Sequence, residues 1–158
     1  MLTAVGVLLF VRSGDGGARV AVGAAAPAIA GPTLDGQSLD LSAYRGKPVL
    51  INFWGPTCVP CRDEFPLLAS KVAQHASDGF AVVGVLNSDP VAMAQQFVTD
   101  FGGTWPTVQD PDKALRTAYR VAAFPTSFFV DRDGVVRSIQ QGYLTDADFE
   151  RQYARIAP

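Results

Sequence analysis

The chain has 158 residues, of which 48% are apolar and only 18% are charged, so its size and composition fit one globular domain with a packed core. Thirteen basic and fifteen acidic residues leave a net charge of -2, which offers no electrostatic footprint for a nucleic-acid backbone. Two cysteines and one histidine are too few for a disulfide-stapled scaffold or a four-ligand zinc site, and we expect no metal and no cofactor.

The amino terminus carries an uninterrupted apolar tract at residues 2–11. As a helix this tract would be about 15 Å long, half of a hydrocarbon core of about 30 Å, so it cannot span a membrane alone. No basic residue precedes it, unlike in a secretory signal. Because a glycine-rich segment follows at residues 13–17, we interpret residues 1–19 as the end of a longer anchor plus a linker, and residues 20–158 as the folded domain. A packed or frayed N-terminal segment is the alternative.

Strand and helix patterns alternate after this segment. Residues 48–54 (PVLINFW) form a β-branched and aromatic run, typical of a strand buried on both faces of a sheet. A helix should follow and end at Gly79, because apolar residues recur on one helical face. The residues of this face are Cys61, Phe65, Leu68 and Val72.

A second buried strand and two helices are expected next. Residues 80–86 (FAVVGVL) form the strand. Ser88-Asp89-Pro90 predicts a helix with a polar cap and a proline in its first turn, and Gly102 should end that helix. Asp110-Pro111 predicts the same cap for a third helix.

The last part of the chain predicts a hairpin and a final helix. Residues 126–130 and 135–140 are strands separated by turn residues, and a helix should start at Thr145, with Leu144 packed on Phe149. Helices between the early strands require parallel pairing, whereas the hairpin must be antiparallel. The sequence therefore predicts an α/β fold with a mixed sheet flanked by helices on both faces. We call the segment between residue 20 and the first buried strand the N-terminal lead, and we expect an extra central helix between the strands.

The two cysteines, Cys58 and Cys61, stand where the first buried strand gives way to a helix. Two intervening residues in a first helical turn bring the thiols close enough to form a disulfide without moving the backbone. The first sulfur then lies among unpaired N–H groups at the helix N-terminus, which stabilise a thiolate. We therefore predict that Cys58 is the nucleophile and that Cys61 resolves the mixed disulfide. Two structural or metal-binding cysteines are the alternative, although only His75 could join them.

Three groups of residues in the same order resemble a known family. They are the lead Val22-Gly23-x-x-Ala26-Pro27 with residues 34–42 and 45–48, the segment 52–66 around the cysteines, and Phe124-Pro125-Thr126 with residues 128–134. This pattern resembles the thioredoxin-like fold and, within it, the TlpA/ResA group of extracytoplasmic thiol-disulfide oxidoreductases. The resemblance covers most of the chain from Val20 onward.

The resemblance implies roles for residues beyond the cysteines. Pro125 would follow a cis peptide bond and face the cysteines, leaving the preceding backbone free to pair with an extended client. A plain proline at the start of a strand is the alternative. Glu64 would handle protons for the buried thiol, although it could also be a glutamate that complements the helix dipole. The rim that a client approaches would comprise Trp54, Gly55, Pro56 and Phe124, with simple burial as the alternative for Trp54.

Asn52 departs from thioredoxin proper, which carries a buried aspartate at this position as its proton acceptor. An asparagine cannot titrate. The difference favours the TlpA-like branch and gives Glu64 more weight as the proton acceptor.

The resemblance implies a monomeric enzyme that reduces disulfides of client proteins outside the cytoplasm, for example in apocytochrome c. A membrane thiol-disulfide reductase would restore its dithiol. The neutral Val59-Pro60 pair favours a reductant, because a histidine there would stabilise the thiolate and favour an oxidant. A disulfide donor with the same motif and a copper-delivery module that uses soft thiolates are the alternatives. A peroxiredoxin is disfavoured, because Gly55 stands where that family expects threonine or serine before its reactive cysteine.

Overall fold

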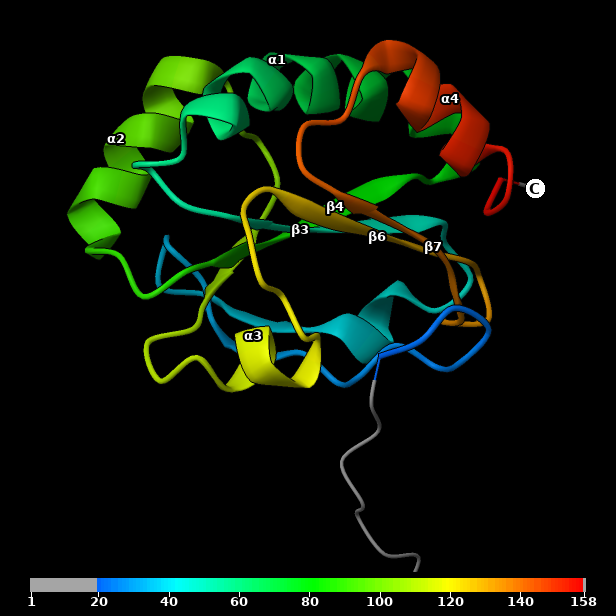
Figure 1. Ribbon diagram of the computed structural model, residues 1–158, viewed down its shortest axis with the longest axis horizontal. Helices are drawn as coiled ribbons and strands as arrows, with labels where there is room; N and C mark the ends of the chain where they lie inside the picture. Colours follow the sequence, from blue (N-terminus) through cyan, green and yellow to red (C-terminus); the bar gives the residue numbers. More distant parts are fainter. Residues whose placement is uncertain (1–19, 158) are drawn as a thin grey trace, which may run out of the picture.

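The computed structural model of the protein describes residues 20–157, so the predicted anchor and linker at residues 1–19 lie outside the described residues. Its centre is a five-stranded sheet in the order β5-β4-β3-β6-β7 (Figure 1). The strands are β3 (Val49–Trp54), β4 (Ala81–Leu86), β5 (Thr107–Gln109), β6 (Thr126–Val130) and β7 (Val136–Gln141). Strands β3, β4 and β5 are parallel, whereas β6 is antiparallel to both β3 and β7, which confirms the predicted mixed sheet.

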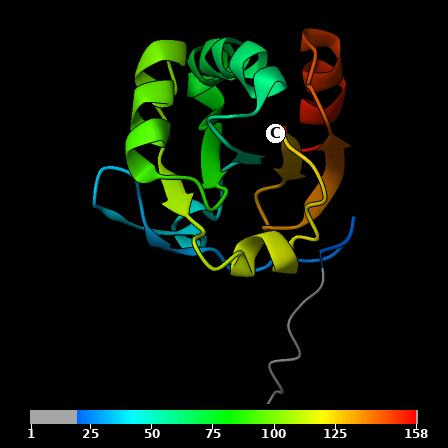
Figure 2. The ribbon, with the colours of Figure 1, turned by 60° about the vertical axis from the view of Figure 1, so that its left-hand side comes forward.

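Helices cover both faces of this sheet, also as predicted (Figures 1 and 2). One face carries α1 (Val59–Gln74), α2 (Val91–Phe101) and α4 (Asp146–Tyr153). The other carries α3 (Ala114–Ala118), the 3-10 turn η1 (Leu41–Tyr44) and the hairpin of β1 (Ala30–Pro32) and β2 (Ser38–Asp40) in the N-terminal lead. Within residues 20–157, no helix is both long and apolar enough to cross a membrane.

The central strand β3 divides the core into two halves. Every residue of β3 is buried, as its continuous apolar run predicts. Leu50 and Trp54 pack under α1 and α2, and Trp54 contacts the rings of Phe65 and Phe97 with centroids 4.7 Å and 5.0 Å away. The alternate residues of β3 pack on the opposite face. Asn52, the polar exception in this strand, therefore points into the interior beneath α1.

Three helix boundaries differ from the sequence predictions. The third helix, α3, begins at Ala114 after the N-cap Lys113, and not at the predicted cap Asp110-Pro111. The first helix, α1, ends at Gln74, and Gly79 instead ends the short 3-10 turn η2 (Ala76–Asp78) with a left-handed φ of 74°. Pro90 is the N-cap of α2 rather than a first-turn residue, and no side chain caps that helix. Gly102 ends α2 as predicted, with a φ of 82°. The differences shift helix ends but leave the order of elements intact.

Short strands were missed by the sequence prediction. The three-residue β5 lies between α2 and α3 and pairs in parallel with the end of β4. Its edge is covered by the lead, where Thr33 bridges to Val108. The β1–β2 hairpin was likewise expected only as an irregular lead.

The last helix, α4, follows its predicted start signals. Thr145 and Asp148 form a capping box, in which each side chain bonds the backbone N–H of the other residue. Leu144 and Phe149 are both completely buried in the core under α1. The loop that ends at Leu144 is thereby fixed against the underside of α1, next to Glu64.

Candidate active site

The cysteine pair lies at the carboxyl end of β3, at the first turn of α1. Cys58 and Cys61 form a disulfide, with their Cα atoms 5.3 Å apart. Cys58 is the N-cap of α1, and the Cys61 backbone N–H points at the Cys58 Sγ, 3.3 Å away. After reduction the same N–H group and the helix dipole would stabilise a thiolate at Cys58.

The two sulfurs differ in how accessible they are. Cys58 is half-buried, whereas Cys61 is only 1% exposed and packs in the core. A second protein can therefore reach Cys58 but not Cys61. The order of exposure matches the order in which a nucleophilic and a resolving cysteine would act.

Glu64 lies one helical turn after Cys61 and has no exposed surface. Its Oε1 accepts a hydrogen bond from Asn52 Nδ2 (2.7 Å), and its Oε2 accepts one from the Leu144 backbone N–H (2.8 Å). Burial raises the pKa of Glu64 from 4.5 to about 7, and these two hydrogen bonds limit the rise. The carboxyl can therefore change its protonation near neutral pH, within one turn of the buried sulfur.

Asn52 connects β3 to both α1 and β6. Its Nδ2 also donates to Ser127 Oγ (3.0 Å), and Asn52 and Ser127 occupy paired positions on adjacent strands. Both side chains are buried. The sequence analysis placed Asn52 near the site as a residue that cannot titrate, but it did not anticipate that its amide would hold Glu64.

The loop before β6 has the expected backbone conformation. The peptide bond between Phe124 and Pro125 is cis. The Pro125 carbonyl accepts from the Gly142 N–H (2.8 Å), which fixes this loop to the end of β7. In the part of the chain that the structure describes, no hydrogen bond engages the backbone N–H or C=O of Phe124. These groups are thus free to pair with an extended peptide.

The predicted rim needs correction, because most of it is buried. Trp54 has no exposed surface, so its ring supports the site from below and offers no surface for a client to touch. Gly55 and Pro56 are buried too. Of the four predicted rim residues only Phe124 is partly exposed, packed against both halves of the core.

Two residues beside Cys58 or Phe124 were not assigned to the site from the sequence. Val59, between the two cysteines, is 64% exposed. The guanidinium of Arg116 on α3 lies 5.0 Å from the centre of the Phe124 ring, and its Nε donates to the Val121 carbonyl (3.1 Å). Val59 could have been found from its place in the motif. Arg116 carries no sequence signal, because nothing in the short pattern of α3 indicates that its side chain turns toward the loop that follows the helix.

Gly55 leaves room for the Asp89 side chain where β3 turns toward the cysteines. A Cβ atom at this position would lie 2.8 Å from Asp89 Oδ2, in the loop after β4. A larger residue would require the end of the Asp89 side chain to move. The glycine therefore lets the loops after β3 and β4 approach each other directly beside Cys58.

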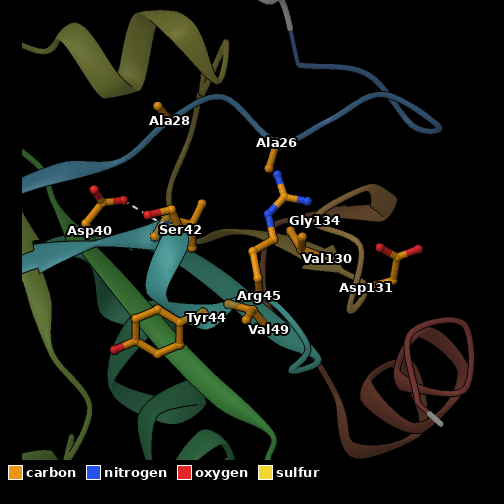
Figure 3. Close-up of a pocket in the computed structure, with 11 residues that line it drawn as sticks. Ala26, Ala28, Asp40, Ser42, Tyr44, Arg45, Val49, Val130, Asp131 and Gly134 are labelled. Carbon is orange, nitrogen blue, oxygen red and sulfur yellow. Dashed lines mark hydrogen bonds between the residues drawn. The ribbon is translucent and has the colours of Figure 1, made fainter.

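Two other features lie apart from this site. A pocket of about 150 Å³ opens at the far end of β3, where Val49 begins the strand and Arg45 crosses over Gly134 (Figure 3). None of the predicted site residues lines it. Across residues 20–157, no group of three or more His, Cys, Asp or Glu side chains is placed to hold a metal ion.

Comparisons with known proteins agree with this geometry. Residues 22–139 match the family model described as the AhpC/TSA family. The chain is 34% identical to the thiol-disulfide oxidoreductase ResA of Geobacillus kaustophilus over 158 residues, which are 100% of this chain and 91% of that protein. It is 29% identical to ResA of Bacillus subtilis over 147 residues, 93% of this chain and 82% of that protein.

Solved structures show the same fold. A thiol:disulfide interchange protein of the thioredoxin family from Chlorobium tepidum superposes with a TM-score of 0.77 at 27% identity, covering 87% of this chain and 98% of that one. The thioredoxin domain of a thiol-disulfide oxidoreductase from Bacteroides vulgatus gives a TM-score of 0.78 at 26% identity, covering 87% and 99%. The chain therefore belongs to the AhpC/TSA family, in its ResA group of thioredoxin-like proteins, and is a thiol-disulfide oxidoreductase.

Proposed function

We propose that the protein is an extracytoplasmic reductant of client disulfides, with Cys58 as the attacking sulfur and Cys61 as the resolving one. The observation that carries this proposal is the arrangement of the dithiol: an accessible sulfur at a helix N-terminus, a buried partner, and a buried acid one turn further along. The motif places Val59 and Pro60 between the cysteines, so no side-chain charge there stabilises the Cys58 thiolate further. The lack of such a charge favours electron donation over electron withdrawal.

The reaction transfers two electrons to the client. The Cys58 thiolate attacks one sulfur of a client disulfide, which forms a mixed disulfide and releases the other client sulfur as a thiolate that takes a proton. The Cys61 thiolate then attacks Cys58 Sγ, which closes the Cys58–Cys61 disulfide and releases the second client thiol. A membrane thiol-disulfide reductase would return two electrons and regenerate the dithiol.

Glu64 would accept the proton that Cys61 must lose. A buried thiol is a poor nucleophile until it is deprotonated. The raised pKa of Glu64, about 7, places its proton exchange near the pH at which the thiol must ionise. This role uses the i, i+3 spacing of Cys61 and Glu64 on α1.

Clients would dock along the loop before β6. The free backbone groups of Phe124 can pair with an extended client segment, while the exposed surface of Val59 contacts its apolar side chains. Pairs of cysteines in unfolded or extended segments, such as the haem-attachment cysteines of an apocytochrome c, have the required form. The protein would act as a monomer, without nucleic acid.

A redox titration of the full chain tests the direction of electron flow. The oxidised fraction of the Cys58–Cys61 pair would be read by mass after alkylation in thiol-disulfide buffers of defined potential. A value near about -270 mV, like thioredoxin, supports a reductant, whereas a value near about -120 mV makes the protein a disulfide donor. If no reversible disulfide forms, the redox function is wrong and metal binding by the thiolates becomes the leading hypothesis.

The location can be tested separately on intact cells. A Cys61→Ser variant keeps a single thiol, at Cys58. We expect a membrane-impermeant maleimide to label this thiol without lysis, with the Cys58→Ser, Cys61→Ser double variant as the unlabelled control. Labelling that requires lysis would overturn an extracytoplasmic location.

A further inference from the structure

The buried side chains of Asn52, Glu64 and Ser127 form a network that the proposed electron transfer does not by itself explain. We propose that Asn52 is a positioning residue that responds to the proton on Glu64: its amide turns by half a rotation when the carboxyl is protonated, so that the carboxyl is hydrogen-bonded in both states. The inference rests on the proton-accepting role proposed for Glu64.

The arrangement in the structure fits the ionised carboxylate. Both oxygens of Glu64 accept hydrogen bonds, Oε1 from Asn52 Nδ2 (2.7 Å) and Oε2 from the Leu144 N–H (2.8 Å). The second hydrogen of Asn52 Nδ2 points to Ser127 Oγ (3.0 Å). Asn52 Oδ1 is buried and has no hydrogen-bond partner among the described residues. Both N–H groups of the Asn52 amide therefore donate hydrogen bonds, whereas its oxygen accepts none.

A proton on Glu64 conflicts with this arrangement. If the proton lies along either existing hydrogen bond, it meets another donor, the Asn52 amide or the Leu144 N–H. The Leu144 N–H cannot turn, because it belongs to a backbone fixed between β7 and the capped start of α4. Asn52 can turn, because its amide needs only a rotation about one side-chain bond.

The turned amide satisfies the protonated state with the same contacts. Oδ1 would take the place of Nδ2, within hydrogen-bond distance of both Glu64 Oε1 and Ser127 Oγ. It would then accept from the carboxyl O–H and from the serine O–H, because a hydroxyl can act as donor or acceptor. The two hydrogen bonds to Glu64 and Ser127 keep their atoms' positions with their direction reversed, and Nδ2 moves to the place of Oδ1, where the structure records no hydrogen bond. Leucine at position 52 could neither donate nor accept, and aspartate could reverse the bond only by gaining or losing a proton of its own.

Among residues 20–157, no charged side chain hydrogen-bonds to Glu64 or contributes to its pKa shift. The contacts of Glu64 come from Asn52 on β3 and from the Leu144 backbone, and Cys61 lies one turn before it on α1. The causes of its pKa shift are burial and these two hydrogen bonds, with no contribution from a neighbouring charge. Asn52 in turn donates to the neutral hydroxyl of Ser127 on β6.

Nuclear magnetic resonance of the oxidised full chain can detect the rotation. Between pH 5 and pH 9 we would follow the Glu64 side-chain carboxyl carbon and the Asn52 side-chain NH₂ group. We expect the Asn52 resonances to shift with the same midpoint as Glu64, and the contacts of the NH₂ hydrogens with Ser127 to be present only above that midpoint. If Glu64 titrates while the Asn52 contacts stay unchanged, the rotation is wrong but the proton role of Glu64 survives. If Glu64 does not titrate in this range, both are wrong.

Substitutions give an independent readout. Asn52→Leu should raise the titration midpoint of Glu64 by up to about one pH unit, a tenfold change in proton affinity, because the hydrogen bond lost by the ionised carboxylate is stronger than the one lost by the protonated carboxyl. Ser127→Ala should keep the Asn52–Glu64 hydrogen bond but reduce the shift of the Asn52 resonances, and it tests the network even if Asn52→Leu fails to fold.

Ser138→Ala is the matched control, because it removes another buried serine hydroxyl on the sheet that makes no hydrogen bond to this network. We expect this variant to leave both the Glu64 midpoint and the pH-dependent shift of the Asn52 resonances unchanged. If Ser138→Ala reduces the shift of the Asn52 resonances as much as Ser127→Ala does, the effect is a general one of core substitutions and the proposal is overturned.

Discussion

Glu64 should make the folded protein lose stability as the pH rises toward neutrality. The pKa of its buried carboxyl is raised from 4.5 to about 7, chiefly by burial. Below pH 4.5 the group is protonated in both the folded and unfolded states and has no effect. Between these values the unfolded chain releases the proton while the folded protein keeps it, so the free energy of unfolding falls. Above pH 7 both states are ionised and the loss is constant.

The size of the loss follows from the width of this interval. The pKa difference between 4.5 and about 7 is about 2.5 units, and each unit corresponds to about 1.4 kcal/mol. The product is about 3 kcal/mol, a large share of the 5–15 kcal/mol by which folded domains are typically stable. The full conversion applies because the side chain has no exposed surface.

Urea unfolding of the disulfide-bonded protein and of its Glu64→Gln variant, from pH 4 to pH 9, measures this effect. The other titrating groups cancel when the unfolding free energy of the variant is subtracted from that of the parent. We expect the difference to fall by about 3 kcal/mol between pH 4.5 and pH 7 and then to level off. Asp63→Asn is the control, because it makes the same change from acid to amide at an exposed position of the same helix, and it should not reproduce the fall expected for Glu64.

Two results would refute this account of Glu64. A flat difference would mean that its carboxyl is as well solvated in the folded protein as in water. A difference that rises with pH would mean that the donors Asn52 and Leu144 outweigh burial and hold the carboxylate ionised. In either case Glu64 could not act as a proton acceptor with a raised pKa.

Three further predictions concern the dithiol, its rim and the core. Cys61→Ser should trap a mixed disulfide with a client on Cys58, visible as a reducible band on a gel, whereas Cys58→Ser should trap none; trapping by both variants would contradict the order of attack. Arg116→Ala should raise the KM for a client disulfide several-fold, because Phe124 loses its cation contact, and should leave the reduction potential unchanged; a changed potential would place Arg116 at the dithiol instead. Phe65→Ala should lower the unfolding free energy by about 3–5 kcal/mol in urea titrations, since the ring is completely buried, and a loss below 1 kcal/mol would contradict its packing.

The elements with long, uniform patterns could be predicted from the sequence. The run from Val49 to Trp54 is buried throughout, and its composition alone distinguishes it from a strand with one exposed face. The three residues of β5 are too few to show a period, and prolines stand close on either side of them, so they carried no strand signal. That strand exists because pairing with β4 and cover from the lead stabilise it.

The site was only partly predictable for a related reason. The cysteine pair and the proline are local motifs, and the structure has the disulfide and the cis peptide bond that they indicate. The sequence is compatible with Trp54 at the surface or in the core. In the structure its ring packs against Phe65 and Phe97 in the core. Arg116 reaches Phe124 because the loop after α3 folds back toward that helix, where the Val121 N–H bonds the Arg116 carbonyl, and no sequence pattern indicates this turn.

The placement of the buried acid on α1 rather than on β3 has a chemical consequence. Had position 52 also been an acid, two carboxyls would stand 2.7 Å apart, at the distance that now separates the Asn52 amide from Glu64, and they would share protons in two coupled steps. The neutral amide leaves one titratable carboxyl beneath the dithiol, which gains or loses a single proton. Resolution of one mixed disulfide requires that a single proton leave Cys61. Glu64 is a single acid one helical turn from Cys61, so it can take up one proton. The Asn52 side chain that holds it can donate or accept a hydrogen bond.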